Sequence, residues 1–181
     1  MSRWHVLILV VVIGLGAGVG CTPAPQTESA PDGQADGAPD GLTGQDYALI
    51  YQLYARYAQG TDFREADLWL SVFTDDAVFQ PGAAADDVVG MEALTEWRAQ
   101  IFAARPPESQ TRHWNSGWVI TQTPGGATGR VYFLGVDVSS GQPALGGSGH
   151  YEDIYVKTSA GWRIQERRFT SDTSMHWLNG Q

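Results

Sequence analysis

Residues 148–170 read SGHYEDIYVKTSAGWRIQERRFT, two runs of alternating side chains separated by a short connection at Ser159-Ala160. Alternation over this length predicts half-buried β-strands, and a short connection between two such runs predicts an antiparallel hairpin. The same period occurs further upstream. The strands expected in this half of the chain lie at 110–121, 129–138, 148–157 and 161–170. The second half of the chain is therefore predicted to form a meander of long strands.

The segment before these strands shows a helical period instead. Apolar residues recur three and four positions apart from Ile50 to Ala58, and Thr43 with Asp46 fits a capping box at the start of this first helix. Two further helices at 64–73 and 91–104, and a short strand at 77–79, are expected before the meander. Helices followed by a meander predict an α+β fold, in which three N-terminal helices pack on one face of a mostly antiparallel sheet.

Charge and composition exclude several classes of protein. The 181 residues include 11 Lys and Arg against 20 Asp and Glu, a formal net charge of −9. This balance disfavours nucleic-acid binding, which normally uses a basic patch. The single cysteine can form no internal disulfide. His113 and His150 have neither the helical spacing nor the neighbouring carboxylates of a zinc site, so no metal is expected.

The first 20 residues have the layout of a secretory signal. Arg3 precedes an uncharged stretch at 6–19, which is shorter than the roughly 20 apolar residues of a membrane-spanning helix. Gly18-Val19-Gly20-Cys21 resembles a bacterial lipobox, and this resemblance implies lipidation at Cys21. The protein is then expected to be exported and anchored in the cell envelope, at the outer membrane in a bacterium with two membranes. The alternative is an ordinary cleaved signal followed by a chance cysteine.

Residues 21–44 differ in composition from both of their neighbours. They are rich in proline and glycine, their charged residues are all acidic, and they contain few apolar residues to bury. We expect this stretch to be a disordered tether. The predicted organisation is therefore a signal at 1–20, a lipidated tether at 21–44 and one folded domain at 45–181.

The order of predicted elements and several local motifs resemble the SnoaL-like group of the nuclear-transport-factor-like cone fold. The motifs are Tyr57-Ala58 leading to Asp62, Leu70-x-x-Phe73-Thr74-x-Asp76-Ala77-Val78-Phe79, Thr111-Arg112-His113, Gly149-x-Tyr151-x-Asp153 and Gly161-Trp162-Arg163-Ile164. The resemblance implies a curved sheet that forms a cone around an internal, mostly apolar pocket, and it implies a homodimer. Relatives include dehydratases, isomerases, cyclases, epoxide hydrolases and domains without known activity, so the fold does not fix the reaction.

Resemblance to one member of this superfamily, scytalone dehydratase, points to a catalytic pair. Asp62 matches its catalytic aspartate and His113 matches one of its two catalytic histidines, whereas the second histidine falls near Asp137 or Val138. A carboxylate that accepts a hydrogen bond from an imidazole fixes its tautomer, so the other ring nitrogen can act as acid or base. We interpret Asp62 and His113 as a simpler proton-transfer dyad. The alternative is a structural histidine bonded to a backbone carbonyl.

Candidate substrate-binding residues are Tyr54, Tyr57, Asn115 and Tyr151. The two tyrosines of the first helix lie on its apolar stripe, where core packing is the alternative role. Strand alternation places Asn115 on the face of His113. A Tyr151 phenol that faces the pocket would hydrogen-bond a substrate oxygen.

The same alternation assigns other side chains to the opposite face or to structural roles. Trp114, Ser116 and Trp118 are expected to share the face of their strand that is turned away from His113. Asp153 and Arg168 lie on neighbouring strands and are expected to form a cross-strand ion pair.

Two functions fit these observations. In the first, the domain binds a small apolar molecule, polyketide- or steroid-like, and acts as a cofactor-independent lyase or isomerase through Asp62 and His113. In the second, it is a non-catalytic binding or dimerisation module of the envelope, with exposed apolar residues on the outer sheet around Trp114 and Trp118. Neither hypothesis requires a cofactor.

Overall fold

The computed structural model describes residues 41–172. The predicted signal at 1–20, Cys21 and all but the last four residues of the predicted tether lie outside the described residues, as do residues 173–181 at the end of the predicted domain. Export and lipidation therefore stay predictions from the sequence. Within 41–172, no helix has the length and apolar character needed to cross a membrane.

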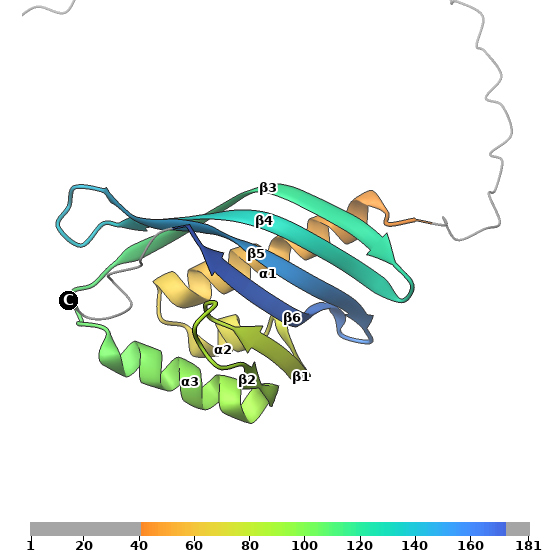
Figure 1. Ribbon diagram of the computed structural model, residues 1–181, viewed down its shortest axis with the longest axis horizontal. Helices are drawn as coiled ribbons and strands as arrows, with labels where there is room; N and C mark the ends of the chain where they lie inside the picture. The colour runs from red at the N-terminus through yellow and green to blue at the C-terminus, as the bar shows by residue number, and fades with distance from the viewer. Residues whose placement is uncertain (1–40, 173–181) are drawn as a thin grey trace, which may run out of the picture. The chain divides into compact units, whose positions relative to one another are not determined.

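The described residues form three helices and one six-stranded sheet, which confirms the predicted α+β fold. The helices are α1 (Gly44–Asp62), α2 (Ala66–Leu70) and α3 (Gly90–Ala104). The strands are β1 (Phe73–Gln80), β2 (Val88–Val89), β3 (Thr111–Thr123), β4 (Gly126–Asp137), β5 (Ala144–Thr158) and β6 (Gly161–Ser171). The sheet order is β2-β1-β6-β5-β4-β3, and every pairing is antiparallel except the parallel pair of β1 and β6. The long strands curve over the helices, which lie on one side of the sheet (Figure 1).

Helix α1 begins at the capping box predicted from Thr43 and Asp46. The Asp46 carboxylate also accepts hydrogen bonds from Lys157 Nζ and Trp162 Nε1, each at 2.8 Å. These contacts fix the start of α1 to the β5–β6 hairpin. The predicted apolar stripe of α1 is buried against the sheet and joins a core rich in aromatic rings.

The segment between α1 and α3 differs from its prediction. The expected helix at 64–73 is confined to α2, because Phe73 begins a strand that pairs with Ile164 of β6. That strand, β1, is longer than the expected 77–79, since its parallel partner extends it at both ends. The two-residue β2 was not predicted because it is too short to show a period.

The predicted ion pair between Asp153 and Arg168 is wrong. Strands β5 and β6 pair with Asp153 opposite Arg167 and with Glu152 opposite Arg168, so adjacent arginines point to opposite faces. Arg167 is fully buried and donates to both oxygens of Asp153, at 2.9 and 2.6 Å. Arg168 instead forms an ion pair with Glu166 at 2.6 Å.

The predicted face of Trp118 is also wrong. Gly117 and Trp118 together lie opposite one residue of β4, which is a β-bulge, and Gly117 has a positive φ of 65°. The bulge turns Trp118 toward α1, where its ring centroid lies 5.0 Å from that of Tyr51. Trp114, before the bulge, stays exposed.

Candidate functional site

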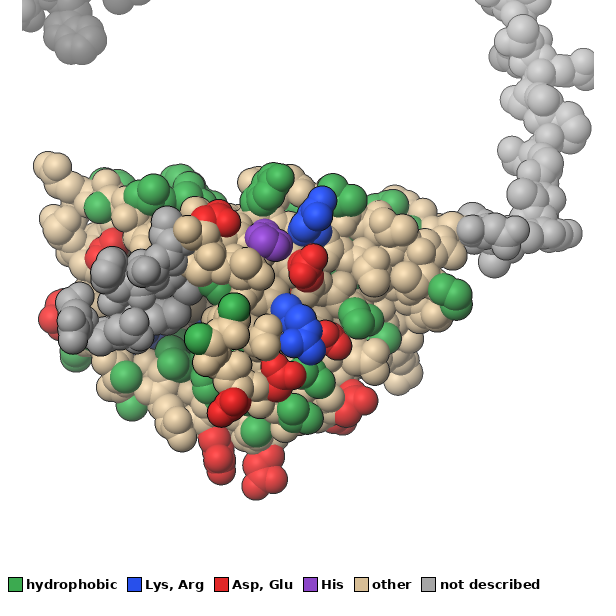
Figure 2. Space-filling view, in the orientation of Figure 1, with side chains coloured by type: hydrophobic (Ala, Val, Ile, Leu, Met, Phe, Trp, Pro, Cys, Tyr) green, Lys and Arg blue, Asp and Glu red, His purple; other side chains and the backbone are tan. Residues whose placement is uncertain are grey.

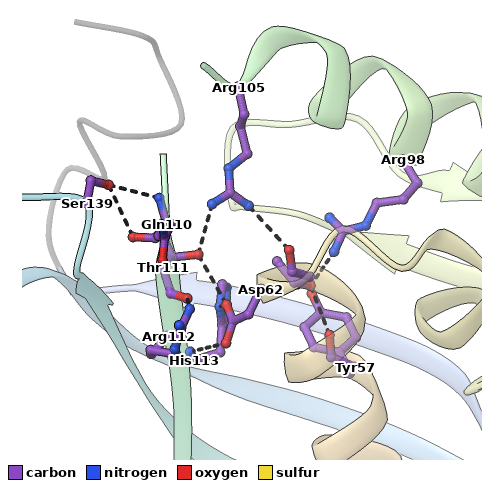
Figure 3. A network of polar contacts seen from close by, with 10 residues as sticks. Tyr57, Asp62, Arg98, Arg105, Gln110, Thr111, Arg112, His113 and Ser139 are labelled. Atoms are coloured by element: carbon purple, nitrogen blue, oxygen red, sulfur yellow. Dashed lines mark hydrogen bonds and ion pairs between the residues drawn. The ribbon is translucent and has the colours of Figure 1, made fainter. Parts of the chain in front are cut away.

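Asp62 and His113 meet where the end of α1 lies against the start of β3 (Figure 3). Their Oδ1 and Nδ1 atoms are 2.5 Å apart, and each side chain is only 5% exposed. The other carboxylate oxygen of Asp62 accepts the backbone N–H of His113 at 2.9 Å. Because a carboxylate only accepts hydrogen bonds, Nδ1 is the donor, and the basic nitrogen of the neutral ring is Nε2.

Two arginines support this pair through threonines. Arg105 donates to Thr111 Oγ1 at 2.9 Å, and Thr111 Oγ1 donates to Asp62 Oδ1 at 3.1 Å. Arg98, from α3, donates to the hydroxyl of Thr61, the neighbour of Asp62. The carboxylate is thus oriented by the Thr111 hydroxyl and by both N–H groups of His113, and the two guanidinium groups reach this cluster from the side of α3 (Figure 3).

An inner cavity of about 260 Å³ lies between the sheet and the helices. Its apolar lining comes mainly from Tyr57, Phe79, Trp97, Ile101, Phe133 and Phe169. Its polar lining consists of Thr61, Arg98, Arg105, His113 and Tyr151. The cavity therefore brings together three of the residues proposed from the sequence, namely Tyr57, His113 and Tyr151.

A second, more open groove of about 760 Å³ runs along the outside, between α1 and β3. Asp62 and His113 line this groove, so the pair lies at its wall, and His113 also lines the inner cavity. The other two candidates, Tyr54 and Asn115, line the groove and not the inner cavity. The Tyr54 hydroxyl donates to Asp153, inside the buried cluster around Arg167, which fits the core-packing alternative.

Burial shifts the titration of several groups around the inner cavity. Removal from water lowers the pKa of Arg98 to about 10, so its guanidinium remains charged at neutral pH. Burial raises the pKa of the Tyr151 phenol well above its usual 10.0, and nearby Tyr57 adds to this increase. Tyr151 is therefore a phenol that can donate a hydrogen bond at neutral pH.

Three residues of this cluster, Arg98, Arg105 and Thr111, were not among the candidates from the sequence. A signal for the arginines was present, since Arg98 interrupts the apolar stripe Leu94, Trp97, Ile101, Phe102 of α3. Arg105 lies three and four residues after the last two members of that stripe, which is in phase with it. A charged residue at a buried helical position is worth noting because it needs a partner.

The described part of the chain contains no group of three or more His, Cys, Asp or Glu side chains that could bind a metal ion. The inner cavity offers guanidinium, imidazole, hydroxyl and phenol groups instead. These groups are suited to hydrogen bonding, proton transfer and the binding of negative charge.

Comparison with known proteins supports the same fold. A family model described as the SnoaL-like domain matches residues 43–168. No curated protein matches the chain. Among solved structures, a Nostoc punctiforme protein of unknown function with a cystatin-like fold is 24% identical, with a TM-score of 0.66 over 75% of this chain and 97% of the other.

Two further solved structures are similar. A Catenulispora acidiphila protein, determined in complex with S-DNPA, is 24% identical, with a TM-score of 0.64 over 72% of this chain and 96% of the other. A putative aromatic ring hydroxylase from Novosphingobium aromaticivorans is 24% identical, with a TM-score of 0.62 over 74% of this chain and 93% of the other. At these identities the similarity establishes a common fold.

Proposed function

The chain belongs to the SnoaL-like domain family, and from this premise we propose that it binds a small, largely apolar molecule in the inner cavity and transfers a proton on it. Asp62 and His113 act as the proton-transfer dyad, in a lyase or isomerase reaction that uses no cofactor. The observation that carries this proposal is the 2.5 Å contact between Asp62 Oδ1 and His113 Nδ1, next to a cavity that His113 itself lines.

The proposed chemistry follows from the roles of the two ring nitrogens. Asp62 holds Nδ1 as a donor, so Nε2 accepts a proton from a carbon next to a substrate carbonyl. The electrons of the broken C–H bond move into the carbonyl and form an enolate. Tyr151 donates a hydrogen bond to the enolate oxygen, and the protonated His113 returns the proton to the same or another carbon. Acid–base catalysis of this kind contributes about 10²–10⁴-fold to a rate.

The size and lining of the cavity favour a compact substrate. A volume of about 260 Å³ lies just below the usual range of ligand pockets, and most of its wall is aromatic or aliphatic. The C. acidiphila protein of the same fold was determined with the small molecule S-DNPA. This similarity supports a small-molecule ligand but does not identify it.

The function can be tested with 2-tetralone, a bicyclic ketone whose α-protons exchange with deuterium in D₂O. We expect the protein to accelerate this exchange, as measured by NMR, and the variants H113A and D62A to lose at least about 100-fold of the acceleration. H150A is the matched control, because His150 lies on β5 and lines neither cavity. Unchanged exchange in H113A would exclude the proposed dyad.

The outer face of the sheet favours a second candidate function, a non-catalytic binding or dimerisation module. Trp114 and Tyr132 are 61% and 62% exposed, on the neighbouring strands β3 and β4. Large aromatic side chains at such positions are enriched in protein interfaces. Under this proposal the domain forms a homodimer through this face, and W114E/Y132E is monomeric in sedimentation analysis. A monomeric wild-type domain would exclude it.

We also propose that the domain is held in the cell envelope by lipid at Cys21, as its N-terminal sequence predicts. A lipidated N-terminus with two or more acyl chains anchors a protein stably, whereas one chain binds a membrane only weakly. Full-length protein should therefore fractionate with membranes, and C21S should be released into the soluble fraction. Equal membrane association of both forms would contradict lipid anchoring.

A further inference from the structure

Two buried arginines line the inner cavity from its polar side. Arg98 lies on α3 and Arg105 directly follows that helix, and they are 3% and 8% exposed. Both guanidinium groups reach Thr61, since Arg98 donates to its hydroxyl and Arg105 donates to its backbone carbonyl at 3.4 Å. Both guanidinium groups point from α3 toward the end of α1 (Figure 3), and both arginines line the cavity.

Neither guanidinium forms an ion pair with a carboxylate among residues 41–172, and Asp62 attracts both charges only from beyond the two threonines. The ion pairs of this region involve other basic groups. Both carboxylate oxygens of Asp62 accept hydrogen bonds from Thr111 and His113 and none from the arginines. The Nε atoms of Arg98 and Arg105 are buried without a hydrogen-bond acceptor in the same region. A buried charge without an ion-pair partner costs several kcal/mol, so the two arginines form an incomplete site.

Aromatic contacts offset this cost only in part. The Arg98 guanidinium lies 4.4 Å from the centroid of the Trp69 ring and 4.5 Å from that of Phe102. Such contacts contribute about 0.5–2 kcal/mol, which is less than the cost of burying a charge. They hold the guanidinium in place, but they leave the cavity positively charged.

We propose that the ligand of the inner cavity carries a carboxylate, which binds Arg98 and Arg105 while its apolar part packs on the aromatic wall. This inference rests on the proposed function, since it takes the inner cavity as the ligand site, and it narrows the ligand to small aromatic or alicyclic carboxylic acids. The planar, forked guanidinium matches a carboxylate in shape, and the hydrogen bonds between them are charge-assisted.

The positive cavity contrasts with the rest of the protein. The chain has a net charge of −9, and acidic side chains gather along the α3 edge of the face shown in Figure 2. General attraction of anions to this surface is therefore weak. An acid that binds tightly must be recognised locally, at the two arginines, so its affinity should depend on them and not on arginines elsewhere.

The test compares an acid with its neutral isostere. We would titrate the full chain with 2-naphthoate and with 2-naphthamide, which have nearly the same size and shape, and measure Kd by calorimetry. We expect 2-naphthoate to bind at least about tenfold more tightly to the wild-type protein. In R98M and R105M this preference should fall to about twofold or less, because each substitution weakens the binding of 2-naphthoate more than that of 2-naphthamide. R130M, which changes an exposed arginine on β4, should keep the full preference.

The outcomes separate this inference from the proposed function. Equal affinity of the wild-type protein for both compounds, or a preference that survives in both R98M and R105M, would overturn the carboxylate site. The wild-type comparison needs no variant, so it decides the matter even where a substitution prevents folding. The wild-type protein could show no preference for 2-naphthoate and still catalyse exchange of 2-tetralone through His113. That result would overturn the carboxylate site and leave the proposed function in place. A clear preference for 2-naphthoate without any exchange of 2-tetralone would support the carboxylate site and contradict the proposed proton transfer.

Discussion

The Asp62 carboxylate makes all of its described contacts with β3, to Thr111 and to the backbone and ring of His113. We predict that D62N reverses the His113 tautomer, because the amide group that replaces one oxygen donates to Nδ1 and moves the ring proton to Nε2. The change should be visible in long-range ¹H–¹⁵N spectra at alkaline pH. It should also lower the free energy of unfolding by about 1–3 kcal/mol.

A substitution at Thr111 is the control for the predicted change of the His113 tautomer. Thr111 donates to the same carboxylate oxygen as His113 but cannot set the ring tautomer. T111V should therefore lose stability without reversing the tautomer. An unchanged His113 spectrum in D62N would contradict the proposed role of the carboxylate.

A second prediction concerns Arg167, which is buried with Asp153 and lies within 4.7 Å of the rings of Tyr54, Tyr57 and Tyr151. R167M keeps much of the apolar volume but leaves the Asp153 carboxylate without its cation. Breaking a buried pair in this way costs about 3–5 kcal/mol. R168M is the matched control, since it breaks a half-exposed pair with Glu166 and should cost less than about 1 kcal/mol. Urea unfolding of both variants measures the difference, and equal losses would contradict it.

Resemblance to scytalone dehydratase predicted the meeting of Asp62 and His113, because both residues match catalytic positions of that enzyme. The resemblance did not predict the cluster of arginines and threonines that supports this pair. Arg98 is a lone charge inside an apolar stripe, and periodicity alone treats such a residue as an interruption. Its role depends on which side chains α1 and β3 bring beside it, and that requires the packing of distant segments.

At the level of elements, the sequence predicted the types and order of the helices and long strands. It did not predict how the residues of neighbouring strands pair. Alternation assigns faces correctly only while pairing stays regular. The bulge at Gly117 reverses the alternation within β3, so Trp114 and Trp118 lie on different faces although their spacing places them on the same one. For Asp153, the choice between Arg167 and Arg168 depended on a one-residue difference in register.

The bulge itself can be tested through G117A. Alanine at a φ of 65° is strained by about 1–2 kcal/mol, and its Cβ would lie 2.6 Å from Cδ2 of Tyr132. G125A is the control, because Gly125 also has a positive φ but has no atom within 4 Å of the added Cβ. We expect G117A to lower the free energy of unfolding more than G125A does, as measured by urea unfolding. The excess should disappear in a Y132A background, and a persisting excess would contradict the steric explanation.

At the scale of the whole molecule, one carboxylate joins the first helix to the last hairpin. Hydrogen bonds to Asp46 from Lys157, Thr43 and Trp162, the largest effect coming from Lys157, hold its pKa far below the usual 3.8. A carboxyl whose pKa is lower in the folded state stabilises the protein above its unfolded pKa, and this contribution is lost as the pH falls below it. The link between α1 and the β5–β6 hairpin should therefore weaken in acid.

We predict that the difference in Tm between the wild-type protein and D46N is largest above about pH 5 and narrows steadily as the pH falls from 4 toward 2. The reason is that protonated Asp46 and the amide introduced by D46N both lack the charge that Lys157 binds. K157M removes the largest cause of the lowered pKa of Asp46. In this variant the stability that the Asp46 carboxylate contributes should therefore be lost completely at a higher pH than in the wild-type protein. D86N, at an exposed loop position, should leave the whole profile unchanged. A Tm difference for D46N that stays constant from pH 7 to pH 2 would show that Asp46 stabilises the fold through its shape and not through its charge.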